Sequence, residues 1–78
     1  MLKATKFQFQ IILFGETSIT EAMENNLYKG GCWDALLCST GNEVYLDFIR
    51  IGLHWNSTLQ TALADVKRAG YTPKLRET

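Results

Sequence analysis

Apolar and polar residues alternate along two stretches of the chain, as they do in a β-strand with one buried face. In residues 7–14, FQFQIILF, one side carries Phe7, Phe9, Ile11 and Leu13. In residues 43–51, EVYLDFIRI, one side carries Val44, Leu46 and Phe48. Successive strand side chains point to opposite faces, so these sets predict the core-facing sides of two strands. Turn residues bound the second stretch, and we expect the rest of the chain to pack against it.

Two other stretches repeat apolar residues every three or four positions, which predicts α-helices. The first covers residues 19–29; a Ser-x-x-Glu capping box at Ser18 begins it, and a glycine pair at residues 30–31 ends it. The second begins with similar capping logic at Ser57 and Gln60, and Gly70 ends it. The stripes expected to be buried are Ile19, Ala22, Met23 and Leu27, followed by Leu59, Ala62, Leu63 and Val66.

The two remaining strands are shorter. Residues 35–39 run into a turn at residues 40–42, so they are expected to form a hairpin with residues 43–51. Residues 71–76 contain Pro73, which has no N–H to give to a neighbouring strand. This last strand is therefore predicted at an edge of the sheet.

The resulting order, β-α-β-β-α-β, predicts an α+β fold of the ferredoxin-like, split βαβ type. Two helices would cover one face of a four-stranded antiparallel sheet, and right-handed crossovers would give the strand order 4-1-3-2. With no linker, repeat or low-complexity segment in the sequence, residues 1–78 are predicted to be a single domain.

Composition limits the classes of function that the chain is expected to have. Eight basic and eight acidic residues give a net charge of zero, which does not favour general attraction to nucleic acid or to a membrane surface. No apolar run approaches the length of a membrane span, and the N-terminus leads into strand-like alternation rather than a signal peptide. Two cysteines, Cys32 and Cys38, are too few for a disulfide framework. We expect reduced thiols and a cytoplasmic protein.

Known catalytic and metal-binding patterns are missing from the sequence. His54 is the only histidine, no Cys-x-x-Cys or His-x-x-x-His spacing occurs, and no serine lies in a nucleophile elbow. We therefore predict no catalytic residues, no metal ligands and no cofactor. An alternative is a small-molecule sensor or minor enzyme with a pocket near Cys32, Trp33 and His54. The candidate loop contacts are Trp33, His54 and Trp55.

The sheet face turned away from the helices is the stronger candidate for binding. Its predicted interaction residues are Ile12, Tyr45, Asp47 and Ile49, an apolar group with a polar rim. The alternative is that Trp33, Trp55 or the loop before the second helix covers this face. Arg50 shares its side of the strand with the buried residues. We expect its stem to be buried and its guanidinium to emerge from the core or to cap a helix C-terminus.

Basic residues gather near the C-terminal end of the chain, at Lys67, Arg68, Lys74 and Arg76. Such charges often complement a helix dipole or protect an edge strand. They also define the alternative of a nucleic-acid-binding or regulatory domain, which is not the favoured interpretation.

Three segments carry a resemblance to a known group of proteins. They are LYKGGCWDA at residues 27–35, Asp47-Phe48-x-Arg50, and the pattern Leu59-x-x-Ala62-Leu63-x-Asp65-Val66-x-x-Ala69-Gly70. Together they resemble the N-terminal α/β domain of small uncharacterised bacterial proteins whose longer members carry a C-terminal helix-turn-helix. The resemblance implies an α/β fold and a regulatory or assembly role.

The favoured interpretation is a non-catalytic protein–protein interaction or oligomerisation module. We expect it to self-associate, as a homodimer, or to bind a protein partner through the open sheet face or an edge strand. Nucleic acid remains an alternative partner and a membrane is not expected.

Overall fold

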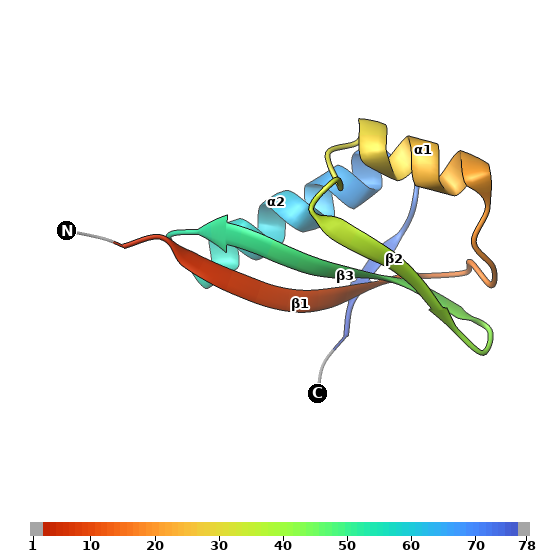
Figure 1. Cartoon of the computed structure of the whole chain (residues 1–78), viewed down its shortest axis with the longest axis horizontal. Helices are drawn as coiled ribbons and strands as arrows, with labels where there is room; N and C mark the ends of the chain where they lie inside the picture. Colours follow the sequence, from red (N-terminus) through yellow and green to blue (C-terminus); the bar gives the residue numbers. More distant parts are fainter. Residues whose placement is uncertain (1–2, 77–78) are drawn as a thin grey trace.

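The structure is a computed structural model that describes residues 3–76, so four residues of the predicted 1–78 domain, 1–2 and 77–78, lie outside the described residues. Strands and helices follow one another in the predicted order (Figure 1). They are β1 (Thr5–Leu13), α1 (Glu21–Lys29), β2 (Ala35–Thr40), β3 (Glu43–Gly52), α2 (Trp55–Arg68) and β4 (Pro73–Leu75).

The four strands form one antiparallel sheet with the order β2-β3-β1-β4. Read from the β4 edge, this order is β4-β1-β3-β2. Both helices lie on the same side of the sheet (Figure 1), which confirms the predicted α+β class and its two layers. The long strands β1 and β3 are central and pair from Thr5–Gly52 to Ile12–Tyr45.

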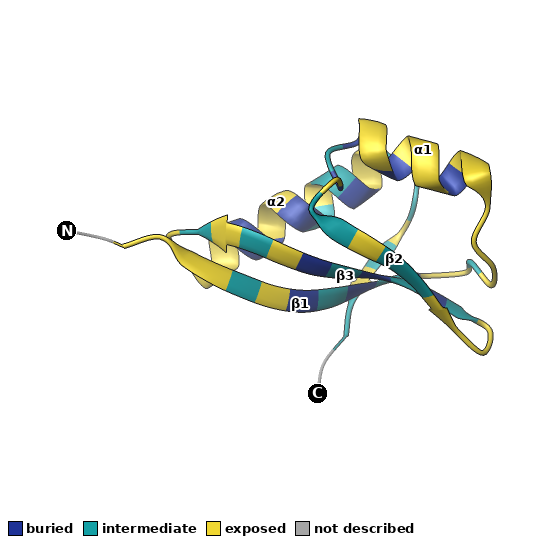
Figure 2. Ribbon diagram, viewed as in Figure 1, coloured by how far each residue is buried: buried dark blue, intermediate teal, exposed yellow. Residues whose placement is uncertain are grey.

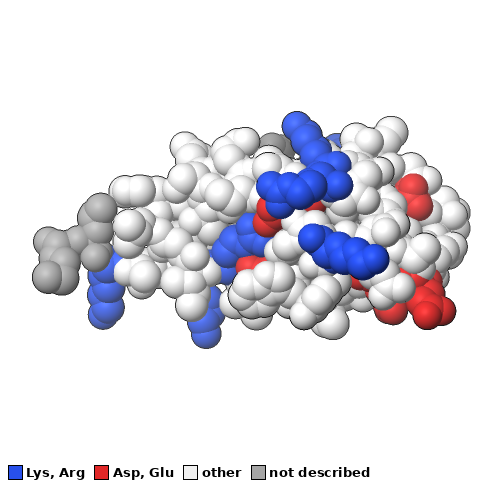
Figure 3. All heavy atoms as spheres, turned by 90° about the horizontal axis from the view of Figure 1, so that it is seen from above, with Lys and Arg blue, Asp and Glu red and all other residues white. Residues whose placement is uncertain are grey.

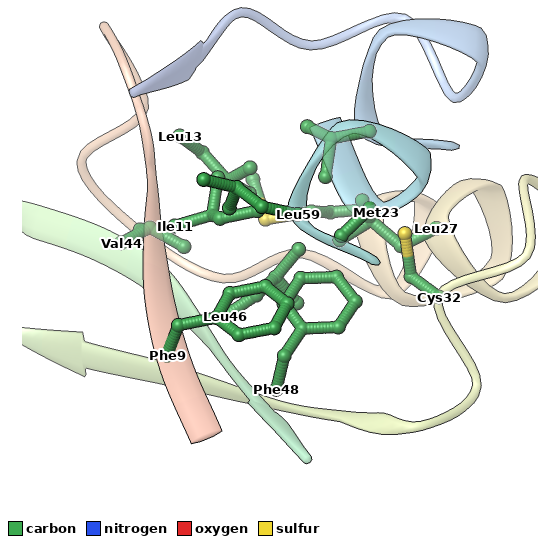
Figure 4. Packing of buried hydrophobic residues seen from close by; sticks show 12 residues of the cluster. Phe9, Ile11, Leu13, Met23, Leu27, Cys32, Val44, Leu46, Phe48 and Leu59 are labelled. Carbon is green, nitrogen blue, oxygen red and sulfur yellow. The ribbon is translucent and has the colours of Figure 1, made fainter. Parts of the chain in front are cut away.

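The core lies between the sheet and the helices. Buried and exposed residues alternate along β1 and β3 (Figure 2), as the sequence pattern predicted. In Figure 4 the rings of Phe9 and Phe48 stack from neighbouring strands, with centroids 5.3 Å apart. The other buried apolar residues are Ile11, Leu13, Met23, Leu27, Cys32, Val44, Leu46, Leu59, Ala62 and Val66. Of the predicted helical stripes, Ile19 and Ala22 are exposed and Leu63 is half-buried.

Both predicted helix starts are wrong, the first by two residues and the second by three. Helix α1 begins after Thr20, not Ser18, because the Thr20 hydroxyl accepts a hydrogen bond from the Met23 N–H at 3.1 Å. Helix α2 begins at Trp55, so Ser57 lies inside the first turn and donates its hydroxyl proton to the His54 carbonyl. A serine in the first turn can make this local bond as readily as a capping bond, and the sequence does not distinguish them.

Strand limits differ from the predicted ones at the ends. Strand β1 begins at Thr5 because its partner β3 continues to Gly52. Strand β4 is reduced to three residues, and its proline sits at the edge of the sheet as predicted. At Gly52, an added Cβ would lie 1.9 Å from the Thr58 hydroxyl oxygen, so the end of β3 and the first turns of α2 are in close contact.

Candidate interaction surface

One face of the sheet is free of helices, and we call it the open face. Strand register brings three pairs of residues together there: Gln8 with Ile49, Gln10 with Asp47, and Ile12 with Tyr45. Residues paired across antiparallel strands share a face. The four predicted interaction residues, Ile12, Tyr45, Asp47 and Ile49, therefore lie on one surface, with the two glutamines beside them.

The exposed apolar part of this face is an apolar strip of four residues. Ile49 is 49% exposed, Leu36 67% and Ile51 68%, and Trp33, just before β2, is 71% exposed. Trp33 and the two isoleucines line one shallow hollow of about 470 Å³. Sequence reasoning missed Leu36. The two-residue turn Gly41-Asn42 pairs Leu36 with Asp47, and that register was the signal that could have placed it on the open face.

Neither tryptophan covers the open face within residues 3–76. Trp55 lies on the helix side, where its ring makes edge contacts with Phe7 and Phe9 at 5.7 and 5.5 Å between centroids. Trp33 remains largely exposed beside the sheet. The ring of Trp55 therefore packs in the opposite layer, whereas Trp33 lies next to Ile49 and Ile51 and leaves both about half exposed or more.

Arg76 covers the part of the open face around Tyr45. The guanidinium of Arg76 lies 5.0 Å from the centre of the Tyr45 ring and forms an ion pair with Glu43. Beside it, Asp47 lines a hollow of about 510 Å³, and one of its carboxylate oxygens is buried without a hydrogen-bond partner among residues 3–76. Tyr45 is thus less available to a partner than Leu36, Ile49 and Ile51.

The predicted basic patch is divided between the two layers of the molecule. Lys74 pairs with Ile12, and with Arg76 it belongs to the open face. Arg68 lies on α2, where it pairs with Asp65 and donates to the Gly30 carbonyl; Lys67 precedes it in the same helix. On the helix side, basic and acidic atoms lie next to each other (Figure 3). The structure does not bring the four basic residues together because the sheet separates them.

Arg50, on β3, contacts the loop before β2 and helix α2, so it links three segments of the chain. Its Nε and Nη2 donate to the two carboxylate oxygens of Asp34 at 2.6 and 2.9 Å, and Nη1 lies 3.1 Å from a carboxylate oxygen of Asp65. Further bonds go to the Thr61 hydroxyl and the Gly31 carbonyl. These contacts use every donor of the guanidinium. We call this group, Asp34, Arg50 and Asp65, the Arg50 clamp.

The clamp fixes the loop that carries Trp33. Asp34 is held through its side chain by Arg50 and through its carbonyl by the Ile49 N–H at 3.2 Å. An added Cβ at Gly31, whose φ is +105°, would lie 3.1 Å from the Asp65 carboxylate. The hydrogen bond to Asp34 also raises the pKa of Arg50 beyond its usual range, in spite of burial. Trp33 and Leu36 are therefore presented from a rigid support.

The predicted pocket of Cys32, Trp33 and His54 does not form. Cys32 and Trp33 line a hollow of about 170 Å³ between α1 and β2. His54 lies at the start of α2, in a separate hollow with Leu53 and Ser57. The two segments are at different ends of α2, and the hollows lined by Trp33 and by His54 have Arg50 and Ile51 in common. Cys32 is buried, and burial, followed by the charge of Asp65, raises the pKa of its thiol from 9.0 to about 11.

The Cys32 thiol predicts how stability depends on pH. Because the unfolded chain releases this proton first, the free energy of unfolding should fall as the pH rises from about 9 to about 11. The difference between the two pKa values corresponds to about 2–3 kcal/mol. Urea denaturation at several pH values would measure it. Cys32→Ala should show a shallower decline, because it lacks this thiol; identical slopes would contradict the prediction.

Comparison with known proteins does not extend this description: no family model, curated protein or solved structure matches the chain. In the part of the chain that the structure describes, no three His, Cys, Asp or Glu side chains form a group that could hold a metal ion. Neither helix described between residues 3 and 76 is long and apolar enough to cross a membrane.

Proposed function

We propose that this chain is a non-catalytic protein-interaction module that self-associates through the apolar strip. The proposal includes the ferredoxin-like topology, which the antiparallel order β2-β3-β1-β4 supports. One observation carries it: Trp33, Leu36, Ile49 and Ile51 are all about half exposed or more, and they lie on or next to adjacent strands of one face. Contiguous exposed apolar residues with a polar rim are typical of protein interfaces.

The free energy gained by burying apolar side chains also favours self-association through the strip. Fully burying one large apolar side chain contributes about 1.5–3 kcal/mol. The strip lies on paired strands and next to the Arg50 clamp, so little backbone ordering is required when a partner binds. The free thiols of Cys32 and Cys38 are consistent with a cytoplasmic setting, which is part of the proposal, as is a role in a regulatory system.

Binding of nucleic acid through the basic residues is the second candidate, and the division of Lys67 and Arg68 from Lys74 and Arg76 weighs against it. Fluorescence anisotropy with labelled RNA and DNA at low salt would detect such binding. A small-molecule sensor is the third candidate, for which a thermal-shift screen over metabolites is the direct measurement.

Leu36→Glu is expected to reduce the mass in solution from that of an oligomer to that of the 8.8 kDa chain. A carboxylate within the strip would have to lose its water when the interface forms, which opposes association. Light scattering would measure the mass, and circular dichroism would show that the fold is retained.

The matched control is Leu53→Glu, which makes the same change at a half-exposed leucine in the loop between β3 and α2. It should leave the mass unaltered. If Leu36→Glu has the same mass as the parent protein, the apolar strip is not the interface.

A further inference from the structure

The two edges of the sheet differ in their protection against pairing with another strand. Strand β4 is three residues long and contains Pro73 and Lys74, and Arg76 follows it. Strand β2 has six residues, ALLCST, with no charge and no proline. In Figure 1 it forms the outer edge of the sheet, and no other strand of residues 3–76 pairs with its outer side. Soluble proteins usually protect an edge strand by charge, proline or shortness, and β2 has none of these.

The main-chain groups of β2 alternate between β3 and the outside. The two-residue turn closes on the pair Thr40–Glu43, which is a hydrogen-bonded pair in such hairpins. Alternate residues then bond to β3, and the chain of bonds ends with the Asp34 carbonyl accepting from the Ile49 N–H. By this alternation Ala35, Leu37 and Ser39 direct their N–H and C=O groups outward.

We propose that β2 pairs antiparallel with β2 of a second copy of this chain, about a two-fold axis at Leu37. This inference rests on the proposed self-association and gives its geometry. The axis sets Leu37 opposite Leu37 of the second copy, Ala35 opposite Ser39, and Leu36 opposite Cys38. Every pair within the strand is uncharged, so no like charges meet, and the same edge serves both copies as a two-fold interface requires.

The flanking residues fit this arrangement. Trp33 lies just before β2, where it lines the hollow beside Ile49 and Ile51 and also, with the largely exposed Tyr28, the hollow of about 170 Å³ next to Ala35 and Leu37. They can cover the new pair of strands from above. On the open face, the pairing sets the two copies of Leu36 close to the seam. The two apolar strips then form one surface across a continuous sheet, which is larger than either strip alone.

Cysteine cross-linking tests the register. In the proposed pairing, residue 36 lies directly opposite residue 38 in a non-hydrogen-bonded pair, where Cα atoms are about 4.5 Å apart, within disulfide range. Leu36→Cys should therefore form a disulfide with the native Cys38 of the second copy under copper-phenanthroline and air. The product is a covalent dimer of twice the chain mass, with the 36–38 linkage identified by peptide mass spectrometry.

The parent protein is the matched control. Its two Cys38 residues are diagonal neighbours, about 7–8 Å apart, which is beyond disulfide reach. It should remain without a covalent dimer under the same conditions. Absence of the 36–38 link, or a predominant 38–38 link, would overturn the proposed pairing.

Ser39→Pro provides an independent measurement. It removes an outward N–H while leaving the bonds between β2 and β3, so the dimer fraction measured by sedimentation should fall with no loss of secondary structure. If Leu36→Glu gives monomers but Ser39→Pro and the cross-link have no effect, the copies meet face to face, and the self-association stands without the edge pairing. A parent protein that is monomeric at hundreds of micromolar overturns both.

Discussion

Phe48→Ala is expected to destabilise the protein by about 3–5 kcal/mol. Phe48 is fully buried at the centre of β3; its ring stacks on Phe9 and lies under the guanidinium of Arg50, 5.1 Å from its centre. Removing a buried phenylalanine side chain costs about 3–5 kcal/mol. A domain of this length has a total stability of about 4–12 kcal/mol, so this loss is a large part of the total. Urea denaturation followed by circular dichroism would measure the change.

Phe14→Ala is the matched control for this prediction. Phe14 follows β1 and is 66% exposed, so the same chemical change removes little buried area. Its effect should stay within about 0.5 kcal/mol. Comparable losses in the two variants would mean that the core is not centred on Phe48 as described above.

Arg50→Ala is expected to destabilise the protein by about 2–4 kcal/mol, between the values for exposed and buried ion pairs. The side chain of Arg50 is 13% exposed, and its removal leaves the carboxylates of Asp34 and Asp65 without their common partner. The Gly31 carbonyl loses a donor as well. Denaturation in urea gives the free energy. Tryptophan fluorescence, which reports Trp33 beside the clamp, should shift under native conditions.

Arg68→Ala separates this effect from a general loss of positive charge. Arg68 shares Asp65 with Arg50, but its side chain is 64% exposed, so the loss should be less than about 1 kcal/mol. Arg50→Lys should recover only part of the stability, because an ammonium cannot make the paired bonds to Asp34. Equal effects of Arg50→Ala and Arg68→Ala would contradict the clamp.

The proposed self-association depends both on the core around Phe48 and on the Arg50 clamp. The core around Phe48 packs one face of β3 against the helices, so that Ile49 and Ile51 on its other face point to solvent. The clamp fixes the entrance to β2, from Trp33 to Ala35, where the strip meets the free edge. A variant that loosens the clamp should therefore weaken both self-association and stability, whereas Leu36→Glu should weaken self-association alone.

Local patterns predicted the elements well and their limits less well. The alternation around Phe9 and Phe48 identified the two central strands, and the glycine at position 70 correctly ended α2. The capping boxes at Ser18 and Ser57 were wrong. Several polar residues near each helix start can satisfy the first amides, and packing of the helix chooses among them: Thr20 caps α1 and no side chain caps α2.

By itself, the sequence determined which residues of the two central strands face the core, because a period of two depends only on local backbone geometry. It also determined the open-face group on β1 and β3 and the edge position of Pro73. Only the tertiary structure decided how distant segments meet: Arg50 between Asp34 and Asp65, Leu36 beside Ile49, Trp55 on the helix side, and the separation of the basic residues. Each of these contacts joins residues that are far apart in the sequence, and such pairs leave no periodic pattern in it. They follow from how the strands align and how the helices pack.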